Sequence, residues 1–276
     1  MKTLIVPTDF SPASLNAMHY AADMAREIHA SILLLHVYQV PLSFTEIPVP
    51  ALSAAEMKDI GEERIQVLKK ELEHITSGSL KVYTEVRLGD PATEIENVCD
   101  PIQPFAVVMG THGGSGVERL LLGSTTLQTL RRSKWPVLVI PPGISYHSIK
   151  KIGLACDYKE VIDSMPVEFI KTLVTEFGAD LHVLHVEDKK HDDGAAMPLE
   201  SAYLDTLLLP AKPKYHFLVS ENVVEGILQY AETHNLDLLI VVPKKHAGWE
   251  GLFHRSQSAG VVTRAHGPVM GVRGSE

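Results

Sequence analysis

Residues 105–125, FAVVMGTHGGSGVERLLLGST, join a short apolar run to a glycine-rich loop. The run 105–109 predicts a buried strand, because parallel strands covered by helices on both faces are apolar throughout. Gly123, Ser124 and Thr125 predict the start of a helix, where the N–H groups and the positive dipole end favour an anion. Glycines between the two elements allow the backbone to approach phosphate oxygens closely. The stretch therefore predicts a strand, a phosphate-binding loop and a helix.

The residues on either side of this stretch alternate predicted strands with predicted helices. Ser11-Pro12 and Asp90-Pro91 each place an N-cap residue before a proline at the first helical position. Alternating units of this kind predict a doubly wound parallel sheet, in which ligands bind at the carboxyl ends of the strands. The expected strands are 2–7, 31–37, 81–87, 105–109 and 135–140, and the expected helices begin at Ser11-Pro12, at about residue 53, at Asp90-Pro91 and near Ser124.

The second half of the chain repeats the first. Three segments recur in the same order: LIVPTD (4–9) as IGLACD (152–157), SILLLHV (31–37) as DLHVLHV (180–186), and KWPVLV (134–139) as HGPVMG (266–271). Pro141-Pro142-Gly143 ends the last strand of the first copy and marks the boundary. The chain is therefore expected to hold two tandem α/β domains, each a doubly wound five-stranded parallel sheet, at residues 1–143 and 144–276.

The composition is that of a globular protein with enough apolar material for two cores. The chain has 276 residues, of which 45% are hydrophobic, and its net charge is −9. This charge gives no support to a nucleic-acid partner, and no stretch reaches the roughly 18 apolar residues of a membrane span. The two cysteines, Cys99 and Cys156, form no metal or redox motif and are interpreted as buried side chains. A cytoplasmic protein with no membrane partner is expected.

The spacing of the loop glycines resembles that of the universal stress protein family. The family signature Gly-x2-Gly-x9-Gly-[Ser/Thr] is matched by Gly110, Gly113, Gly123 and Ser124. The opening segment 7–11, PTDFS, resembles the family's first strand and turn, and His36-Val37 resembles the end of its second strand. The resemblance covers nearly the whole chain as a tandem pair, and it implies an adenine nucleotide α-hydrolase-like fold.

The resemblance also implies a ligand, which is ATP, with or without Mg²⁺. Asp9 would face the ribose and adenine, and the Val37 backbone would meet the adenine edge. Gly110 would lie against the sugar and phosphates, and the other loop residues would hold the phosphate chain. From the residues alone, Asp9 also fits a turn carboxylate, and Val37 fits simple strand packing. The expected binding set is Pro7, Thr8, Asp9, Val37, Met109, Gly110, His112, Gly113, Gly123, Ser124 and Thr125.

The second copy lacks the glycine loop. Aligned without gaps, Val242, Lys245 and Arg255 replace Gly110, Gly113 and Gly123, and only the serine at 256 is kept. Side chains at these positions are predicted to prevent ATP binding of the same kind. The basic residues of this region are interpreted as solvated surface or as contacts between the copies, with a different bound anion as the alternative; they are Lys244, Lys245, His246, His254 and Arg255.

The glycine loop carries few groups for catalysis. It contains no lysine and a single carboxylate, Glu118, and it does not match the GxxxxGK[ST] phosphate loop. Hydrolysis would need a positioned base, usually with a metal, and no catalytic or metal-binding residue is assigned. An ATP-binding stress-response or regulatory protein is therefore expected. The alternatives are a slow ATPase or nucleotidyl-transfer enzyme, and a scaffold without nucleotide.

The last strands of the two copies suggest how the halves meet. Family members commonly dimerise through this strand, and segments 135–140 and 268–272 are the equivalent edges here. Pairing them would bury two exposed strand edges. The chain is thus expected to form a pseudo-dimer within itself, and a homodimer would need another surface.

Overall fold

A computed structural model describes residues 1–40, 53–111, 123–156, 165–187, 197–242 and 257–274. In the first half it has five strands and four helices within these ranges. They are β1 (Thr3–Pro7), α1 (Pro12–Glu27), β2 (Ser31–Tyr38), α2 (Ala54–Ile75), β3 (Val82–Leu88), α3 (Pro91–Ile102), β4 (Ala106–Gly110), α4 (Ser124–Arg132) and β5 (Val137–Ile140).

The described part of the second half follows the same plan. Its elements are β6 (Lys151–Ala155), α6 (Val167–Phe177), β7 (Asp180–Glu187), α7 (Met197–Leu208), a 3₁₀ turn (Leu209–Ala211), β8 (Lys214–Val219), α8 (Val223–Thr233), β9 (Leu238–Val241), α9 (Gln257–Arg264) and β10 (Val269–Gly271). The predicted alternation of strands and helices is confirmed.

Local sequence signals set the helix starts. The Ser11 side chain accepts a hydrogen bond from the Ser14 N–H at the start of α1, and Asp90 accepts one from Thr93 at the start of α3. Before α2, Ser53 and Glu56 form a capping box, in which each side chain bonds the other residue's backbone N–H. These caps satisfy N–H groups that have no partner within the helix, so each helix begins where its cap stands.

The strands form one ten-stranded sheet in the order β3-β2-β1-β4-β5-β10-β9-β6-β7-β8. Within each half all neighbouring strands are parallel, and the second half repeats the strand order of the first. At the centre β5 and β10 pair antiparallel, with Val139 opposite Val269. The α/β fold is therefore confirmed as two five-stranded parallel units joined edge to edge.

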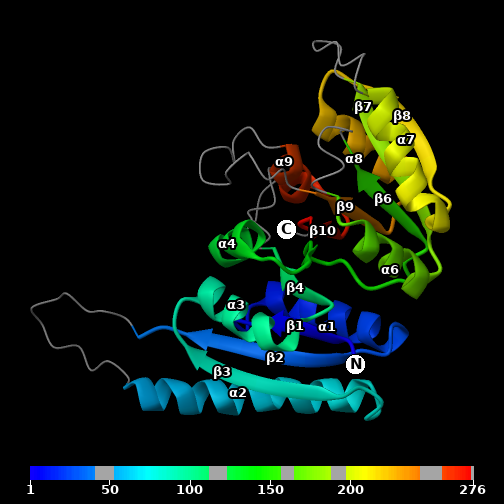
Figure 1. The fold of residues 1–276 in the computed structure, drawn as a ribbon. Coiled ribbons are helices and arrows are strands. Elements are labelled where there is room, and N and C mark those ends of the chain that lie inside the picture. Colours follow the sequence, from blue (N-terminus) through cyan, green and yellow to red (C-terminus); the bar gives the residue numbers. More distant parts are fainter. Residues whose placement is uncertain (41–52, 112–122, 157–164, 188–196, 243–256, 275–276) are drawn as a thin grey trace, which may run out of the picture.

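Helices cover both faces of the sheet, as a doubly wound fold requires. One core lies beneath α1, α2, α6 and α7 and includes Met18, Leu72 and Leu173; the other lies beneath α3, α4, α8 and α9 and includes Ile95 and Val261. Neighbouring strand residues alternate between these two cores. Figure 1 shows α2 running along the outside of the first half next to β3, and the C-terminus near the centre of the molecule beside β10.

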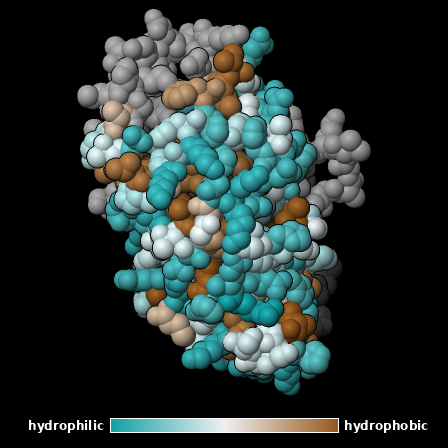
Figure 2. Space-filling model, turned by 90° about the vertical axis from the view of Figure 1, so that its right-hand side faces the viewer, coloured by the Kyte–Doolittle hydropathy of each residue, from teal (hydrophilic) through white to brown (hydrophobic). Residues whose placement is uncertain are grey.

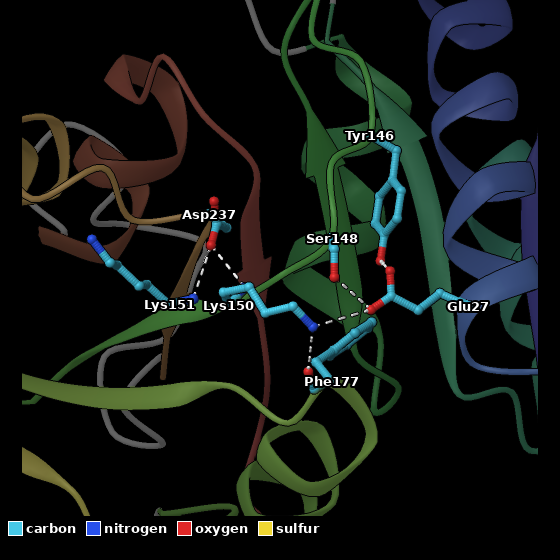
Figure 3. A network of polar contacts seen from close by, with 7 residues as sticks. All are labelled: Glu27, Tyr146, Ser148, Lys150, Lys151, Phe177 and Asp237. Carbon is cyan, nitrogen blue, oxygen red and sulfur yellow. Dashed lines mark hydrogen bonds and ion pairs between the residues drawn. The ribbon is translucent and has the colours of Figure 1, made fainter.

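The segment between β5 and β6 ties the two halves together (Figure 3). Glu27, at the end of α1, accepts hydrogen bonds of 2.8 Å from the Tyr146 hydroxyl and from the Ser148 hydroxyl. Further along, Asp237 accepts hydrogen bonds of 2.8 Å from the N–H groups of both Lys150 and Lys151. The connecting segment is thus held by α1 of the first half and by the residue before β9 of the second half.

The surface seen in Figure 2 is mainly hydrophilic, with hydrophobic residues in small separate groups. Within the described residues, no helix combines the length and the apolar character needed to cross a membrane. Both cysteines, Cys99 and Cys156, are buried, as expected.

Candidate functional site

A cavity of about 300 Å³ opens at the carboxyl ends of β1 and β4. These two strands are neighbours in the sheet, yet β1 is followed along the chain by β2 on its other side, so the cavity lies at the topological switch point. Nine of the predicted binding residues line it: Pro7, Thr8, Asp9, Val37, Met109, Gly110, Gly123, Ser124 and Thr125. The other two, His112 and Gly113, lie outside the described residues.

The turn after β1 is fixed by its own side chains. The Thr8 N–H donates to the Leu35 carbonyl at 2.8 Å, and the Thr8 hydroxyl lies 3.1 Å from the Ser14 hydroxyl and accepts the Phe10 N–H at 3.0 Å. Phe10 has a φ of 63°, a conformation that non-glycine residues rarely adopt. Its ring packs 4.5 Å from the His36 ring, centroid to centroid, which holds the side chain in place. The turn is therefore rigid at the cavity wall.

Asp9 combines a structural contact with an exposed carboxylate. Its Oδ1 accepts the Ser11 N–H at 3.0 Å, so the turn role considered from the sequence is present. Burial raises the pKa of Asp9, but hydrogen bonds from Ser11 and Ser14 outweigh it and hold the pKa below its ordinary value of 3.8. The side chain is exposed at the cavity. A fixed negative charge can accept hydroxyl hydrogen bonds from a ligand there.

Val37 offers its backbone to the cavity. Leu35 is the last β2 residue paired with β1, and its carbonyl points toward β1 because it accepts the Thr8 N–H. Val37 lies two residues further along β2. Its N–H and C=O therefore point to the same side of the strand as the Leu35 carbonyl, which is the side of β1. At that level the described pairing with β1 has ended. This backbone donor and acceptor on one strand edge can hydrogen-bond a planar ring that carries an acceptor and a donor on its own edge.

Gly110 brings the helices on both sides of the cavity close to β4. A Cβ on this residue would lie 2.2 Å from the Ala13 carbonyl oxygen in the first turn of α1, a distance that real atoms do not tolerate. The Gly110 carbonyl also accepts a hydrogen bond from the Thr126 hydroxyl of α4 at 3.1 Å. The need for glycine at this position therefore comes from packing within the protein.

The N-terminus of α4 faces the cavity without a side-chain cap. Gly123 is the N-cap residue, and within the part of the chain that the structure describes no side-chain hydrogen bond caps the first turn of the helix. Ser124 is exposed, and both Ser124 and Thr125 line the cavity. Uncapped N–H groups, two hydroxyls and the positive end of the helix dipole together form an anion-binding surface.

Sequence reasoning missed part of the cavity wall. Three kinds of residue were overlooked: small residues at the start of α1, a residue of β2, and residues near the starts of α3 and α4. The N-cap signal at Ser11 could have indicated that this turn faces the strand ends, because β1 leads directly into it. The residues are Ser11, Ala13, Ser14, Leu35, Pro91, Ile95 and Thr126.

The second half keeps the frame of this turn. His185 Nδ1 lies 3.0 Å from the Cys156 carbonyl, as His36 Nδ1 lies 2.8 Å from the Thr8 carbonyl. The equivalent of Gly110 is Val242, whose side chain packs against the core beneath α6 and α7. The predicted substitutions Lys245 and Arg255 and the rest of the basic cluster (Lys244, His246 and His254) lie outside the described residues.

The repeated unit matches a known family twice. The model of the universal stress protein family matches residues 1–141 and again residues 149–273. The chain belongs to the universal stress protein family. It is 33% identical over 142 residues to a universal stress protein of Methanocaldococcus jannaschii, in an alignment that covers 50% of this chain and 81% of that protein. Universal stress protein YxiE of Bacillus subtilis is 27% identical over 143 residues, covering 50% and 97%.

A solved structure extends the likeness to the whole chain. A universal stress protein from Archaeoglobus fulgidus has the same fold, with a TM-score of 0.75, 20% sequence identity, and coverage of 99% of this chain and 98% of that one. The tandem universal stress protein resemblance is thus confirmed. The gap between the two family matches, residues 142–148, spans the predicted boundary at 143/144, which stays a prediction.

Proposed function

We propose that this universal stress protein binds one adenine nucleotide, ATP, in the cavity at the ends of β1 and β4. The observation that carries the proposal is the convergence of three different groups on one cavity: the Asp9 carboxylate, the Val37 backbone and the uncapped N-terminus of α4. Each suits a different part of a nucleotide. Family membership supports a stress-response role for the binding.

In this proposal each group has a separate task. Asp9 accepts hydrogen bonds from the ribose hydroxyls, and the Val37 N–H and C=O hydrogen-bond the adenine edge. The apolar walls Met109 and Ile95 pack on the ring, since buried apolar area contributes about 25 cal/mol per Å². Ser124 and Thr125 donate to the phosphates, which also gain from the dipole of α4. Mg²⁺ would enter with the phosphates and neutralise part of their charge.

We further propose that the antiparallel junction of β5 and β10 allows a single chain to take the place of a dimer. The proposal is supported by the pairing of Val137–Val139 with Val269–Gly271, which removes both edges from solvent. A homodimer of such chains would then use a different surface.

The nucleotide proposal is tested by comparing two variants of the α4 N-cap residue that differ in charge but have nearly the same shape. Gly123 has a φ of −58°, which any residue adopts. Gly123→Asp should preserve or raise the melting temperature, because aspartate is a good N-cap, yet it places a negative charge where the phosphates bind. Gly123→Asn is the neutral control of nearly equal shape. Calorimetric titration with ATP should give an affinity at least about tenfold weaker for Gly123→Asp than for Gly123→Asn, given charges about 4–5 Å apart.

Equal ATP affinities in the two variants would contradict the phosphate position. An absence of ATP binding by the unmodified chain, seen both by titration and by an unchanged melting temperature in excess ATP, would reject the function itself.

A further inference from the structure

The two copies match residue by residue from α3 to β5 and from α8 to β10, at a constant offset of 132. Lys134 Nζ lies 3.1 Å from Asp100 Oδ1 in the first copy, and His266 Nδ1 lies 3.0 Å from Glu232 Oε1 at the equivalent positions of the second. Equivalent polar pairs thus join the same elements in both halves. Residues at equivalent positions therefore have equivalent surroundings in the two halves.

One large side chain of the first copy is missing in the second. Trp135 precedes β5, its indole Nε1 is buried, and it packs against the core beneath α3 and α4. The equivalent residue before β10 is Gly267. A Cβ built on Gly267 meets nothing within 4 Å, and its φ lies outside the left-handed region that favours glycine. Backbone geometry therefore does not require glycine there, and the space of an indole side chain stands open.

A cavity of about 240 Å³ lies at this place and includes Gly267 in its wall. Its apolar lining comes from Leu228, Ala231, Leu236 and Leu239. For comparison, an engineered apolar cavity of about 150 Å³ binds benzene. The cavity lies at the amino ends of β9 and β10, whereas the nucleotide cavity lies at the carboxyl ends of β1 and β4.

The rim of the cavity favours positive charge. Glu232 and Asp237 both line it. The helices α8 and α9 both end at its edge, where the chain's own cations already lie: Lys151 Nζ donates to the His234 carbonyl after α8 at 2.9 Å, and Arg264 is in the last turn of α9. His266 pairs with Glu232, and the Asp237 Oδ2 accepts N–H groups from the connecting segment, so the carboxylates are held in position.

We propose that this cavity binds a flat aromatic ligand of indole size that carries a positive charge. In the first copy, Trp135 carries an indole ring at the position equivalent to Gly267, packed against the core. Glu232 and Asp237 at the rim favour a positive charge on the ligand. The second half of the chain, without the glycine loop, would then hold a ligand site of a different kind.

Calorimetric titration of the full chain with tryptamine, indole and indole-3-acetate tests the proposal. Saturable binding of tryptamine at one site per chain is expected, with indole weaker and indole-3-acetate weakest. Gly267→Trp copies the first half and should weaken tryptamine binding at least about tenfold, or 1.4 kcal/mol. Gly267→Leu is the second variant, which fills the cavity with a smaller side chain and should weaken binding in the same direction.

The reverse variant is the matched control. Trp135→Gly opens the equivalent space in the first copy, so indole stoichiometry should rise from one to two per chain. Tryptamine binding that is unchanged in Gly267→Trp and Gly267→Leu would put the ring elsewhere, for example in the nucleotide cavity, and would overturn the proposal. Stronger binding of indole-3-acetate than of tryptamine, or no binding of any of the three probes, would overturn it as well.

Discussion

Gly110 has a packing role in addition to its place in the cavity wall. Its missing Cβ lets the Ala13 carbonyl approach β4, and its own carbonyl binds Thr126. The sequence resemblance implies contact with the sugar and phosphates of a nucleotide at this position. Since the packing role accounts for the glycine on its own, a substitution here would disturb the fold before it tested ligand binding.

A direct prediction follows at this residue. Gly110→Ala should lower the free energy of unfolding by about 2 kcal/mol or more, because the added methyl group overlaps backbone atoms that cannot move independently. Urea denaturation measures this change. Gly267→Ala is the control, as its Cβ meets nothing within 4 Å, and it should stay within about 0.5 kcal/mol of the unmodified chain. Equal losses in the two variants would contradict the packing role.

Several of the predicted residues that line the cavity lie where a strand ends. Asp9, Val37 and Gly110 stand at the ends of β1, β2 and β4, and parallel strands end at the same edge of a sheet. Ala13 and Thr126 were missed because their contacts join elements more than ninety and about sixteen residues apart, respectively. Such close approaches depend on how the helices pack against the sheet, and the spacing of apolar residues in the sequence does not reveal this packing.

At the scale of elements, histidines of β7 and β8 cluster with Tyr230 of α8. His182 is buried, and its Nδ1 lies 3.1 Å from His216 Nε2 and 3.2 Å from the Tyr230 hydroxyl. The mutual contact of these histidines was not predicted from the sequence. Burial, with the charges of His216 and Lys214, lowers the pKa of His182 below its ordinary 6.5.

The sign of this shift predicts how stability depends on pH. A histidine with a lowered folded-state pKa takes up protons more readily when unfolded, so its contribution is fully present above pH 6.5 and is lost as the pH falls through the folded-state pKa. Melting temperatures should therefore fall below pH 6.5, and His182→Leu should reduce that slope. The groups that face His182 and His216 are Asp180, Lys151, Lys214, Tyr230 and His234.

The control for this prediction is His147→Gln, which changes an exposed histidine in the segment between the halves. Its pH slope should match that of the unmodified chain. A slope unaffected by His182→Leu would show that the cluster does not titrate in this range.

Helix and strand positions were predictable because short-range signals and apolar runs agree. Ser11-Pro12, Ser53 and Asp90-Pro91 stand at the observed starts of α1, α2 and α3. The start of β5 was expected at residue 135, but it begins at Val137, since Trp135 and Pro136 precede the ladder. Proline has no N–H for strand pairing, which explains the later start.

At the scale of the whole molecule, the site helix α4 touches the second half. It begins at the cavity with Ser124, and its Leu130 side chain packs against Gly271 of β10, where a Cβ would lie 2.9 Å away. The Arg273 guanidinium donates to the Arg131 carbonyl at the end of the same helix. The second half thus supports one wall of the first half's cavity, in addition to the contacts of the connecting segment at Glu27.

The two halves differ at the residue that ends β4 and at its equivalent after β9. The first half has Gly110 beside the uncapped start of α4, whereas the second has Val242 at the equivalent position. The nucleotide proposal therefore predicts one nucleotide for each chain and not two.

The measurement that tests this most directly is the stoichiometry of ATP binding to the full chain, by calorimetric titration at a protein concentration well above the dissociation constant. One ATP per chain for the unmodified protein, with an affinity at least about tenfold weaker in Gly123→Asp than in Gly123→Asn, is the predicted result. Two ATP molecules per chain would contradict the prediction. An ATP affinity that is the same in Gly123→Asp and in Gly123→Asn would contradict it as well.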